Sequence, residues 1–239
     1  MNIQKLHENW TALGQEDPMW LVLTDPGKKG GRWQTEDFFE TGRREIHAAL
    51  EKIKQTGRVL KFERALDFGC GLGRLSQALA GVFSKVDAVD ISASLLDQAR
   101  TLNKFPDRVS YHLNVRTDLS IFPPDTFDFI YSNICLQHIP AQFQKLYVAE
   151  FVRRLRPGGS AYFQVIHARG WRHWVPGDLA DAYRKIKNRG RPFISMHPLP
   201  AGQVCTVVHA AGGAVCAKEF TPYAGYETRF VNGRFLVTK

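Results

Sequence analysis

The sequence predicts an α/β fold in which a doubly wound, mostly parallel sheet carries helices on both faces. Short apolar runs alternate with segments of helical apolar spacing between residues 64 and 166, a pattern typical of parallel strands joined by helices. A glycine-rich turn follows the first apolar run, at residues 69–73. The chain has 239 residues, 44% of them hydrophobic, which suits one domain of this kind and would cramp a second.

Residues 1–57 are predicted to form a helical preface to the sheet. Apolar residues repeat at spacings of three and four in two stretches, which contain Ile3, Leu6, Trp10 and Leu13, and then Phe39, Ile46, Leu50 and Ile53. The first stretch ends at Gly14 and the second at Gly57, and glycine is common just after a helix. Thr35 is the candidate N-cap of the second helix.

Residues 58–166 contain five predicted strands. They are residues 64–68, 86–90, 109–113, 127–133 and 161–166. The first connecting helix runs from about Gly73 to Ala80, and Ser92 is the candidate N-cap of the second. A Leu-Arg-Pro-Gly-Gly turn at residues 155–159 leads into the fifth strand.

The last part of the chain is predicted to complete a seven-stranded sheet. A long excursion over residues 167–199 precedes a helix over residues 200–211. Residues 214–220 and 229–237 are expected to be the closing strands. The pair Asn232-Gly233 is a turn signal inside the last run, so the register of this hairpin stays open.

The glycine turn and an acidic residue together predict a nucleoside site. Gly69, Gly71 and Gly73 let the backbone pass close to a ligand and adopt positive φ. Asp90 ends the second strand, 17 residues beyond Gly73, where a carboxylate can accept both hydroxyls of a ribose. A dinucleotide fingerprint spaces its glycines differently, and no basic residue lies between these glycines to meet a phosphate.

At this point the chain resembles the class I S-adenosylmethionine-dependent methyltransferases. The segment from Leu66 to Gly73, with Asp67 two residues before the first glycine, has the form of their first motif. Further similarity lies in Ser132-Asn133, the following Leu-Gln-His-Ile, and the turn at residues 155–159. These motifs follow the order and spacing of bacterial small-molecule methyltransferases. The resemblance implies a Rossmann-like fold, S-adenosylmethionine as cofactor, S-adenosylhomocysteine as product, and in-line methyl transfer.

The resemblance also implies which residues hold the cofactor. They are Asp67, Gly69, Gly71, Gly73, Asp90, Ile91, Asn114, Val115 and Asn133. Ile91 is expected against the adenine face. Many members have an acidic residue after the third strand for the adenine amino group, whereas this chain has Asn114, Val115 and Arg116 before Asp118. That contact falls to Asn114, to backbone groups, or to Asp118.

His138 is the candidate general base, needed only if the methyl acceptor is protonated at neutral pH. It follows the fourth strand on the predicted pocket side, and histidine titrates near neutrality. The alternative is a structural histidine in the first turn of a helix. No metal site is predicted, because the four cysteines are scattered and no histidine pair has ligand spacing.

Residues 167–199 are interpreted as an acceptor-binding insertion, since an excursion of that length in a compact domain is usually functional or mobile. The alternative is a helix with a solvated basic face. The preface, residues 1–57, is interpreted as a lid over the cofactor. Candidate substrate-binding residues are Trp33, Gln137, His167, Trp171, Arg172 and His197. Packing is the alternative role for the tryptophans and the histidines.

Charge and composition leave three functions open. The net charge is +9, and residues 168–192 hold seven basic and two acidic residues, which suits an acidic ligand, nucleic acid or an anionic membrane surface. A small-molecule methyltransferase is the first hypothesis, with an oxygen or nitrogen acceptor. An RNA methyltransferase acting on ribose or a ring nitrogen, and a non-catalytic S-adenosylmethionine-binding protein, are the alternatives. No apolar stretch suits a membrane span and no signal sequence is apparent, so a cytoplasmic location is expected.

Overall fold

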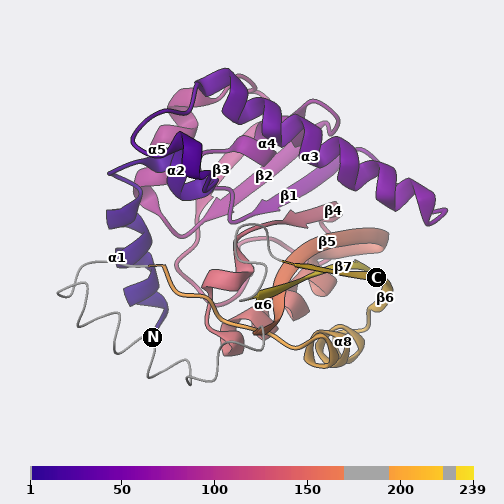
Figure 1. The fold of residues 1–239 in the computed structure, drawn as a ribbon. Coiled ribbons are helices and arrows are strands. Elements are labelled where there is room, and N and C mark those ends of the chain that lie inside the picture. The colour runs from indigo at the N-terminus through magenta and orange to yellow at the C-terminus, as the bar shows by residue number, and fades with distance from the viewer. Residues whose placement is uncertain (1, 170–193, 223–229) are drawn as a thin grey trace.

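The described part of the chain folds around one mixed sheet. The structure is a computed structural model that describes residues 2–169, 194–222 and 230–239. Within these residues, seven strands pair in the order β3-β2-β1-β4-β5-β7-β6 (Figure 1). The strands are β1 (Arg64–Phe68), β2 (Lys85–Asp90), β3 (Val109–Leu113), β4 (Phe127–Ser132), β5 (Leu155–Arg169), β6 (Ala214–Pro222) and β7 (Phe230–Thr238). The first five are parallel, and β7 runs antiparallel to β5 and β6.

Helices cover both faces of this sheet. The longer helices are α1 (Ile3–Leu13), α3 (Thr35–Gln55), α5 (Ala93–Leu102), α6 (Ala141–Arg154) and α8 (Ala201–Ala210), and the shorter ones are α2 (Pro18–Val22), α4 (Arg74–Ala80), η1 (Pro26–Lys28) and η2 (Leu136–His138). Helices α3, α4 and α5 lie over one face, and α6 and α8 lie over the other. The doubly wound fold predicted from the sequence is therefore confirmed.

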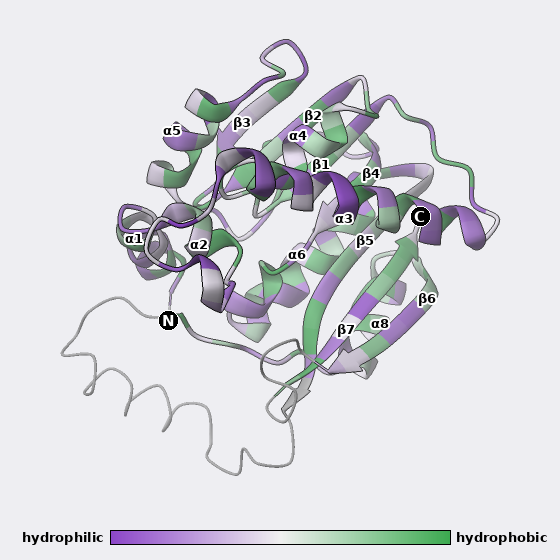
Figure 2. Cartoon of the chain, turned by 45° about the horizontal axis from the view of Figure 1, so that its top comes forward, coloured by the Kyte–Doolittle hydropathy of each residue, from purple (hydrophilic) through white to green (hydrophobic). Residues whose placement is uncertain are grey.

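The packing of α3 against α4 depends on a close approach. One side of α3 is buried through Ile46, Ala49 and Ile53, and Figure 2 shows hydrophobic and hydrophilic residues alternating along this helix, as expected for a helix with one buried face. A Cβ atom at Gly42 would collide with the backbone oxygen of Arg74. Glycine at this position therefore lets α3 lie directly against the helix that follows the glycine turn.

The N-terminal helix α1 is fixed to the loop after β2 and to the start of α5. Ser92 Oγ donates to the backbone oxygen of Trp10 at 3.1 Å, and Ser94 Oγ donates to that of Thr11 at 2.7 Å. The His7 ring bonds to the backbone oxygen of Ile91 at 2.5 Å. These contacts place α1 beside the carboxyl end of β2, where the predicted nucleoside site lies.

The structure corrects one local expectation and answers two others. Thr35 is the first residue of α3 rather than its cap, since Gln34 precedes the helix without a side-chain cap bond. Residues 155–159 lie within the span of β5, but residues 156–159 have no partner in the β4 or β7 registers and Gly158 has a φ of 82°, which agrees with the predicted turn. Asn232 and Gly233 pair inside β7 with both β5 and β6. Pairing on two sides overrides the local turn preference there.

Candidate functional site

An open cavity of about 880 Å³ lies at the carboxyl ends of β1, β2 and β4. This volume includes space that is open to solvent. The sheet side of its wall includes Gly69, Gly71, Asp90, Ile91, Asn114, Asn133 and His138. The N-terminal helices contribute Ile3, Leu6 and Trp10 from α1, and Leu21 and Val22 from α2. Strand ends that are distant in the sequence therefore meet at one cavity that is closed partly by the preface.

The glycine turn has a backbone that only glycine accommodates without strain. Gly69, Gly71 and Gly73 have φ angles of 78°, 52° and 78°, in the left-handed region. A Cβ at Gly69 would collide with Sγ of Cys135, and one at Gly71 would lie 2.7 Å from Cγ2 of Val22. Gly69 and Gly71 line the cavity, whereas Gly73 caps the start of α4.

The Asp90 carboxylate holds the glycine turn and faces the cavity. Its Oδ2 accepts a hydrogen bond from the backbone N–H of Gly71 at 2.8 Å, and its Oδ1 accepts one from that of Ser92 at 2.8 Å. Burial raises the pKa of Asp90, although these hydrogen bonds oppose the increase. A carboxylate has about four acceptor positions, so both oxygens retain capacity for ligand hydroxyls. This is the arrangement that ribose recognition requires.

Asp67 lies behind the glycine turn and does not line the cavity. Its side chain is wholly buried, and Oδ2 accepts a hydrogen bond from Ser76 Oγ at 2.6 Å. Among the described residues, Oδ1 has no hydrogen-bond partner. Burial raises the pKa of Asp67 to about 7. In this geometry Asp67 acts on the cavity only through the turn and α4.

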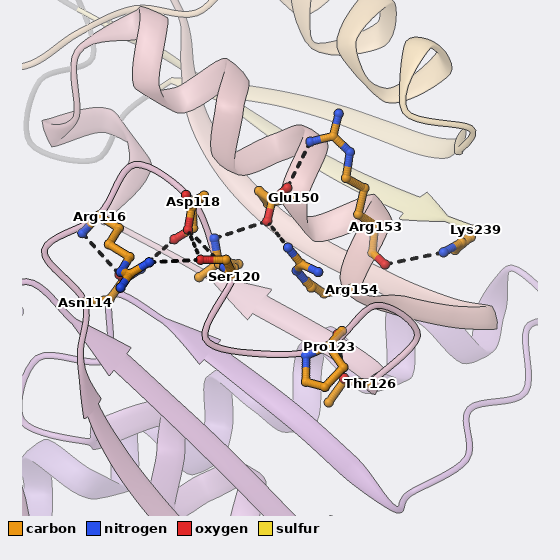
Figure 3. A network of polar contacts seen from close by, with 11 residues as sticks. Asn114, Arg116, Asp118, Ser120, Pro123, Thr126, Glu150, Arg153, Arg154 and Lys239 are labelled. Atoms are coloured by element: carbon orange, nitrogen blue, oxygen red, sulfur yellow. Dashed lines mark hydrogen bonds and ion pairs between the residues drawn. The ribbon is translucent and has the colours of Figure 1, made fainter.

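Asn114 lies at the cavity edge with its amide engaged in the loop after β3 (Figure 3). Its Nδ2 donates to the backbone oxygen of Asp118 at 2.8 Å, and its Oδ1 accepts from the backbone N–H of Arg116 at 3.2 Å. The Asp118 carboxylate accepts from the backbone N–H and hydroxyl of Ser120 instead. Val115 is partly exposed and does not line the cavity. Both candidate side chains are therefore engaged within the loop, and the choice among Asn114, Asp118 and backbone groups for the adenine amino group is not decided.

Asn133, at the end of β4, is joined to α3 and α4 through Glu45. The Glu45 Oε1 accepts from Asn133 Nδ2 at 2.6 Å and from the Tyr131 hydroxyl at 2.9 Å. Its Oε2 pairs with Arg74 Nη2 at 2.7 Å, and the Arg74 side chain is only 4% exposed. The network places a buried ion pair beside the cavity wall, and the sequence analysis did not identify it.

His138 lines the cavity with both ring nitrogens engaged. Its Nδ1 is 2.9 Å from the backbone oxygen of Ser195, and its Nε2 is 2.9 Å from Nε2 of Gln137. Burial lowers the pKa of His138 to about 4. The Trp10 ring from α1 packs against it at 5.2 Å between centroids. The imidazole is therefore neutral at pH 7, and its role as general base stays a prediction.

Comparisons with known proteins agree with this geometry. A family model described as a methyltransferase domain matches residues 65–159. The chain is 33% identical over 147 residues to a ubiquinone biosynthesis O-methyltransferase of Thiobacillus denitrificans, covering 61% of this chain and 62% of that protein. It is 35% identical over 154 residues to a malonyl-[acyl-carrier protein] O-methyltransferase of Salmonella typhimurium, covering 61% and 55%. The matched residues are those of a methyltransferase domain, and these similarities support the predicted class I S-adenosylmethionine-dependent methyltransferase. It spans less than two thirds of the length of either relative.

Two solved methyltransferase structures share the fold over nearly the whole chain. Magnesium protoporphyrin IX methyltransferase from Synechocystis, solved with bound S-adenosylhomocysteine, has a TM-score of 0.63 at 13% identity and 99% coverage of both chains. A putative sarcosine dimethylglycine methyltransferase from Galdieria sulphuraria has a TM-score of 0.64 at 14% identity, with 99% of this chain and 97% of that chain covered. The coverage includes the N-terminal and C-terminal parts that lie outside the matched family model.

Of the six predicted substrate-binding residues, the four that lie within the described ranges do not line the cavity. Trp33 packs edge-on against Phe38, and its indole N–H donates to the backbone oxygen of Leu23. His167 Nδ1 accepts from the backbone N–H of Ala201 at 3.0 Å. Gln137 lies directly behind His138. Trp171 and Arg172 lie outside the described residues.

The backbone of His197 is hydrogen-bonded to η2 and α6, on the side of His138 that faces away from the cavity. Its backbone N–H donates to the oxygen of Gln137 at 2.7 Å, and its backbone oxygen accepts from Gln144 Nε2 at 2.7 Å. Its side chain does not line the cavity.

Four residues at or near the cavity were missed by the sequence analysis as site residues. They are Trp10, Glu45, Arg74 and Gln164. Two carried a usable signal, since Arg74 directly follows the glycine turn and Gln164 interrupts an apolar strand. Glu45 and Trp10 had none, because their positions depend on how the preface packs against the sheet.

Proposed function

We propose that this chain binds S-adenosylmethionine in the cavity at the carboxyl ends of β1, β2 and β4, and transfers its methyl group to a small-molecule acceptor. The observation that carries the proposal is the joint placement of the left-handed glycine turn and the Asp90 carboxylate on one cavity wall. The relatives named as O-methyltransferases support an oxygen acceptor.

The residues present fit this cofactor. The turn has no side chain at Gly69 and Gly71, so the backbone there can approach a ligand closely. Asp90 would accept the ribose hydroxyls, with Ile91 beside it for the adenine face. Bound S-adenosylmethionine supplies a methyl group already activated on a sulfonium. The protein therefore needs mainly to orient the acceptor and exclude water.

The preface is proposed to act as a lid and to favour an apolar acceptor. Helices α1 and α2 place Ile3, Leu6, Trp10, Leu21 and Val22 on the cavity wall. The charged groups there, Asp90 and Arg74, are bonded to backbone or to Glu45. An acceptor with a hydrophobic ring or chain would bury apolar surface against these helices without leaving a charge unpaired.

The four cysteines are free thiols, which supports a reducing compartment and therefore the cytoplasm. Among the described helices, none has the length and apolar character to cross a membrane. We further infer that residues 1–239 work as one domain, because the preface supplies part of the cavity wall.

Calorimetric titration with S-adenosylhomocysteine tests the proposed function, with NAD as the control ligand. The Asp90→Ala variant should lose at least about tenfold to a hundredfold in affinity, which is the loss of a single hydrogen bond of about 1.5–3 kcal/mol to a charged group. The matched control is Asp97→Ala on α5, whose carboxylate is 75% exposed and pairs with Arg100. Wild-type protein that binds NAD, or binds neither ligand, would overturn the cofactor assignment.

An acceptor screen then separates the remaining functions. Quinol precursors and carboxylic acids with apolar tails are the first compounds to test, beside transcribed RNA. Turnover of a small molecule supports the proposal. Methylation of RNA alone supports the nucleic-acid alternative, and tight cofactor binding without turnover of any acceptor supports a non-catalytic role.

A further inference from the structure

An unbroken chain of hydrogen bonds runs from the cavity wall to the segment after residue 193. The backbone N–H of Ile134 donates to Gln164 Oε1 at 3.0 Å, and Gln164 Nε2 donates to Gln137 Oε1 at 2.9 Å. Gln137 Nε2 then meets His138 Nε2 at 2.9 Å, and His138 Nδ1 meets the backbone oxygen of Ser195 at 2.9 Å. The three side chains are buried, at 2%, 1% and 8% exposure.

The two backbone ends fix the direction of every bond in this chain. The N–H of Ile134 can only donate, so the Gln164 amide must present its oxygen there and its NH₂ group to Gln137. Gln137 then donates to His138, which requires an unprotonated Nε2. The proton of a neutral imidazole must lie on Nδ1, where the oxygen of Ser195 accepts it.

The hydrogen-bond series begins at the cavity wall with Ile134, a residue in an unfavourable backbone conformation. Ile134 has a φ of 56°, which is a genuine outlier for a β-branched residue, and such backbone states persist only where surrounding contacts enforce them. Ile134 lines the cavity between Asn133 and Cys135. The bond from Gln164 therefore acts on the peptide that shapes this part of the wall.

We propose that Gln164 and Gln137 are positioning residues of the methyl-transfer site, which fix the direction of the hydrogen-bond chain and thereby hold Ile134 left-handed and His138 neutral with its proton on Nδ1. The inference rests on the proposed function only for the chemistry assigned to the cavity. A consequence is that the Nε2 lone pair of His138 is occupied by Gln137. His138 then orients the wall and does not accept a proton from the acceptor.

The Gln164→Glu variant tests the direction of the chain. A carboxylate at position 164 still accepts from the Ile134 N–H but cannot donate to Gln137. The Gln137 amide must turn, so that its oxygen faces His138 Nε2. His138 then satisfies both Gln137 and the oxygen of Ser195 only as an imidazolium, with a proton on each nitrogen.

The readout is the ¹⁵N–¹H correlation spectrum of protein labelled in histidine, titrated with pH, with the His138 signal assigned from a His138→Phe variant. In the wild type we expect the neutral Nδ1–H tautomer and a pKa near 4. In Gln164→Glu the pKa of His138 should rise by about two pH units or more, because a nearby carboxylate favours the charged form. Among the described residues, the other ionisable side chain beside His138 is His197, whose coulombic effect lowers the pKa of His138, and its signal is followed in the same spectra.

The matched control is Gln77→Glu, which makes the same change at another buried amide. Gln77 bonds to the backbone of Leu102 and Lys104 and takes no part in the hydrogen-bond series from Ile134 to Ser195. It should leave the His138 signal unchanged. A wild-type spectrum with the proton on Nε2 would overturn the inference without any variant. An unshifted His138 in folded Gln164→Glu would do the same at a pH where the introduced carboxyl is ionised, since a protonated carboxyl could still donate to Gln137.

Titration of the wild type with S-adenosylhomocysteine separates this inference from the proposed function. If the pKa of His138 shifts in Gln164→Glu but the wild type does not bind the ligand, the hydrogen-bond series is supported and the cofactor assignment is overturned. If the wild type binds the ligand but the pKa of His138 does not shift in Gln164→Glu, the cofactor assignment is supported and the proposed role of the hydrogen-bond series is overturned.

Discussion

Replacing Asp67 with asparagine should stabilise the protein above pH 7 and give no such gain below about pH 4. The Asp67 carboxyl is wholly buried, keeps one hydrogen bond from Ser76, and its Oδ1 has no partner within the described ranges. Burial raises its pKa from 3.8 to about 7. Because the folded-state pKa lies above the unfolded one, the protonated form is favoured by folding. This contribution is fully present below the unfolded pKa and is lost as the pH rises through about 7.

The magnitude follows from the size of the pKa change. A difference of about three pH units at about 1.4 kcal/mol each gives an upper limit of about 4 kcal/mol in the free energy of unfolding at pH 8. The asparagine side chain of the variant does not ionise, and its amide oxygen can still accept from Ser76. The gain for Asp67→Asn at about pH 8 should be positive but smaller than this limit, because the amide NH₂ group takes the buried position where Oδ1 has no partner.

Urea unfolding followed by tryptophan fluorescence, at about pH 5 and about pH 8, measures the effect. The matched control is Asp97→Asn on α5, where the carboxylate is 75% exposed. The reasoning is refuted if Asp67→Asn changes the free energy of unfolding by the same amount at both pH values.

Two further substitutions test the cavity wall. Gly69→Ala should destabilise the protein by about 1–3 kcal/mol, because the residue has a φ of 78° and its Cβ would collide with Cys135, whereas Gly202→Ala in α8, with open space around it, should be neutral or stabilising. Equal melting temperatures for the two variants would contradict this. Glu45→Gln should cost about 1–3 kcal/mol by removing the charge that pairs with the buried Arg74 guanidinium, against a small effect of Glu40→Gln on the exposed side of the same helix. A loss in Glu45→Gln no larger than in Glu40→Gln, measured by urea unfolding, would show that the ion pair contributes little.

The strands of the core were predictable because their signals are local. The predicted bounds of β1 and β3 match the structure, and β2 and β4 differ by one residue at one end. Apolar runs bounded by glycine, proline or polar residues leave few alternatives for a strand buried on both faces. The turn at Gly69 was predictable for the same reason, since alternating glycines after a strand specify a backbone that other residues avoid.

Long-range contacts decided what the local signals left open. Asn232-Gly233 is a strong turn signal on its own, but β7 lies between β5 and β6 and pairs with both. Ladder bonds on two sides outweigh the turn preference of two residues. The placement of Trp33 beside Phe38, away from the cavity, likewise depends on how the preface packs.

The sequence by itself determined the fold class, the glycine turn and the acid at the end of β2, because each is written in consecutive residues. Only the tertiary structure decided the protonation of the site. The raised pKa of Asp67 and the lowered pKa of His138 both come from burial by segments distant in the sequence. The direction of the bonds from Ile134 to Ser195 depends on β5, η2 and residue 195 meeting in space. Solvent exclusion and hydrogen-bond direction are properties of the assembled chain, so no local pattern reports them.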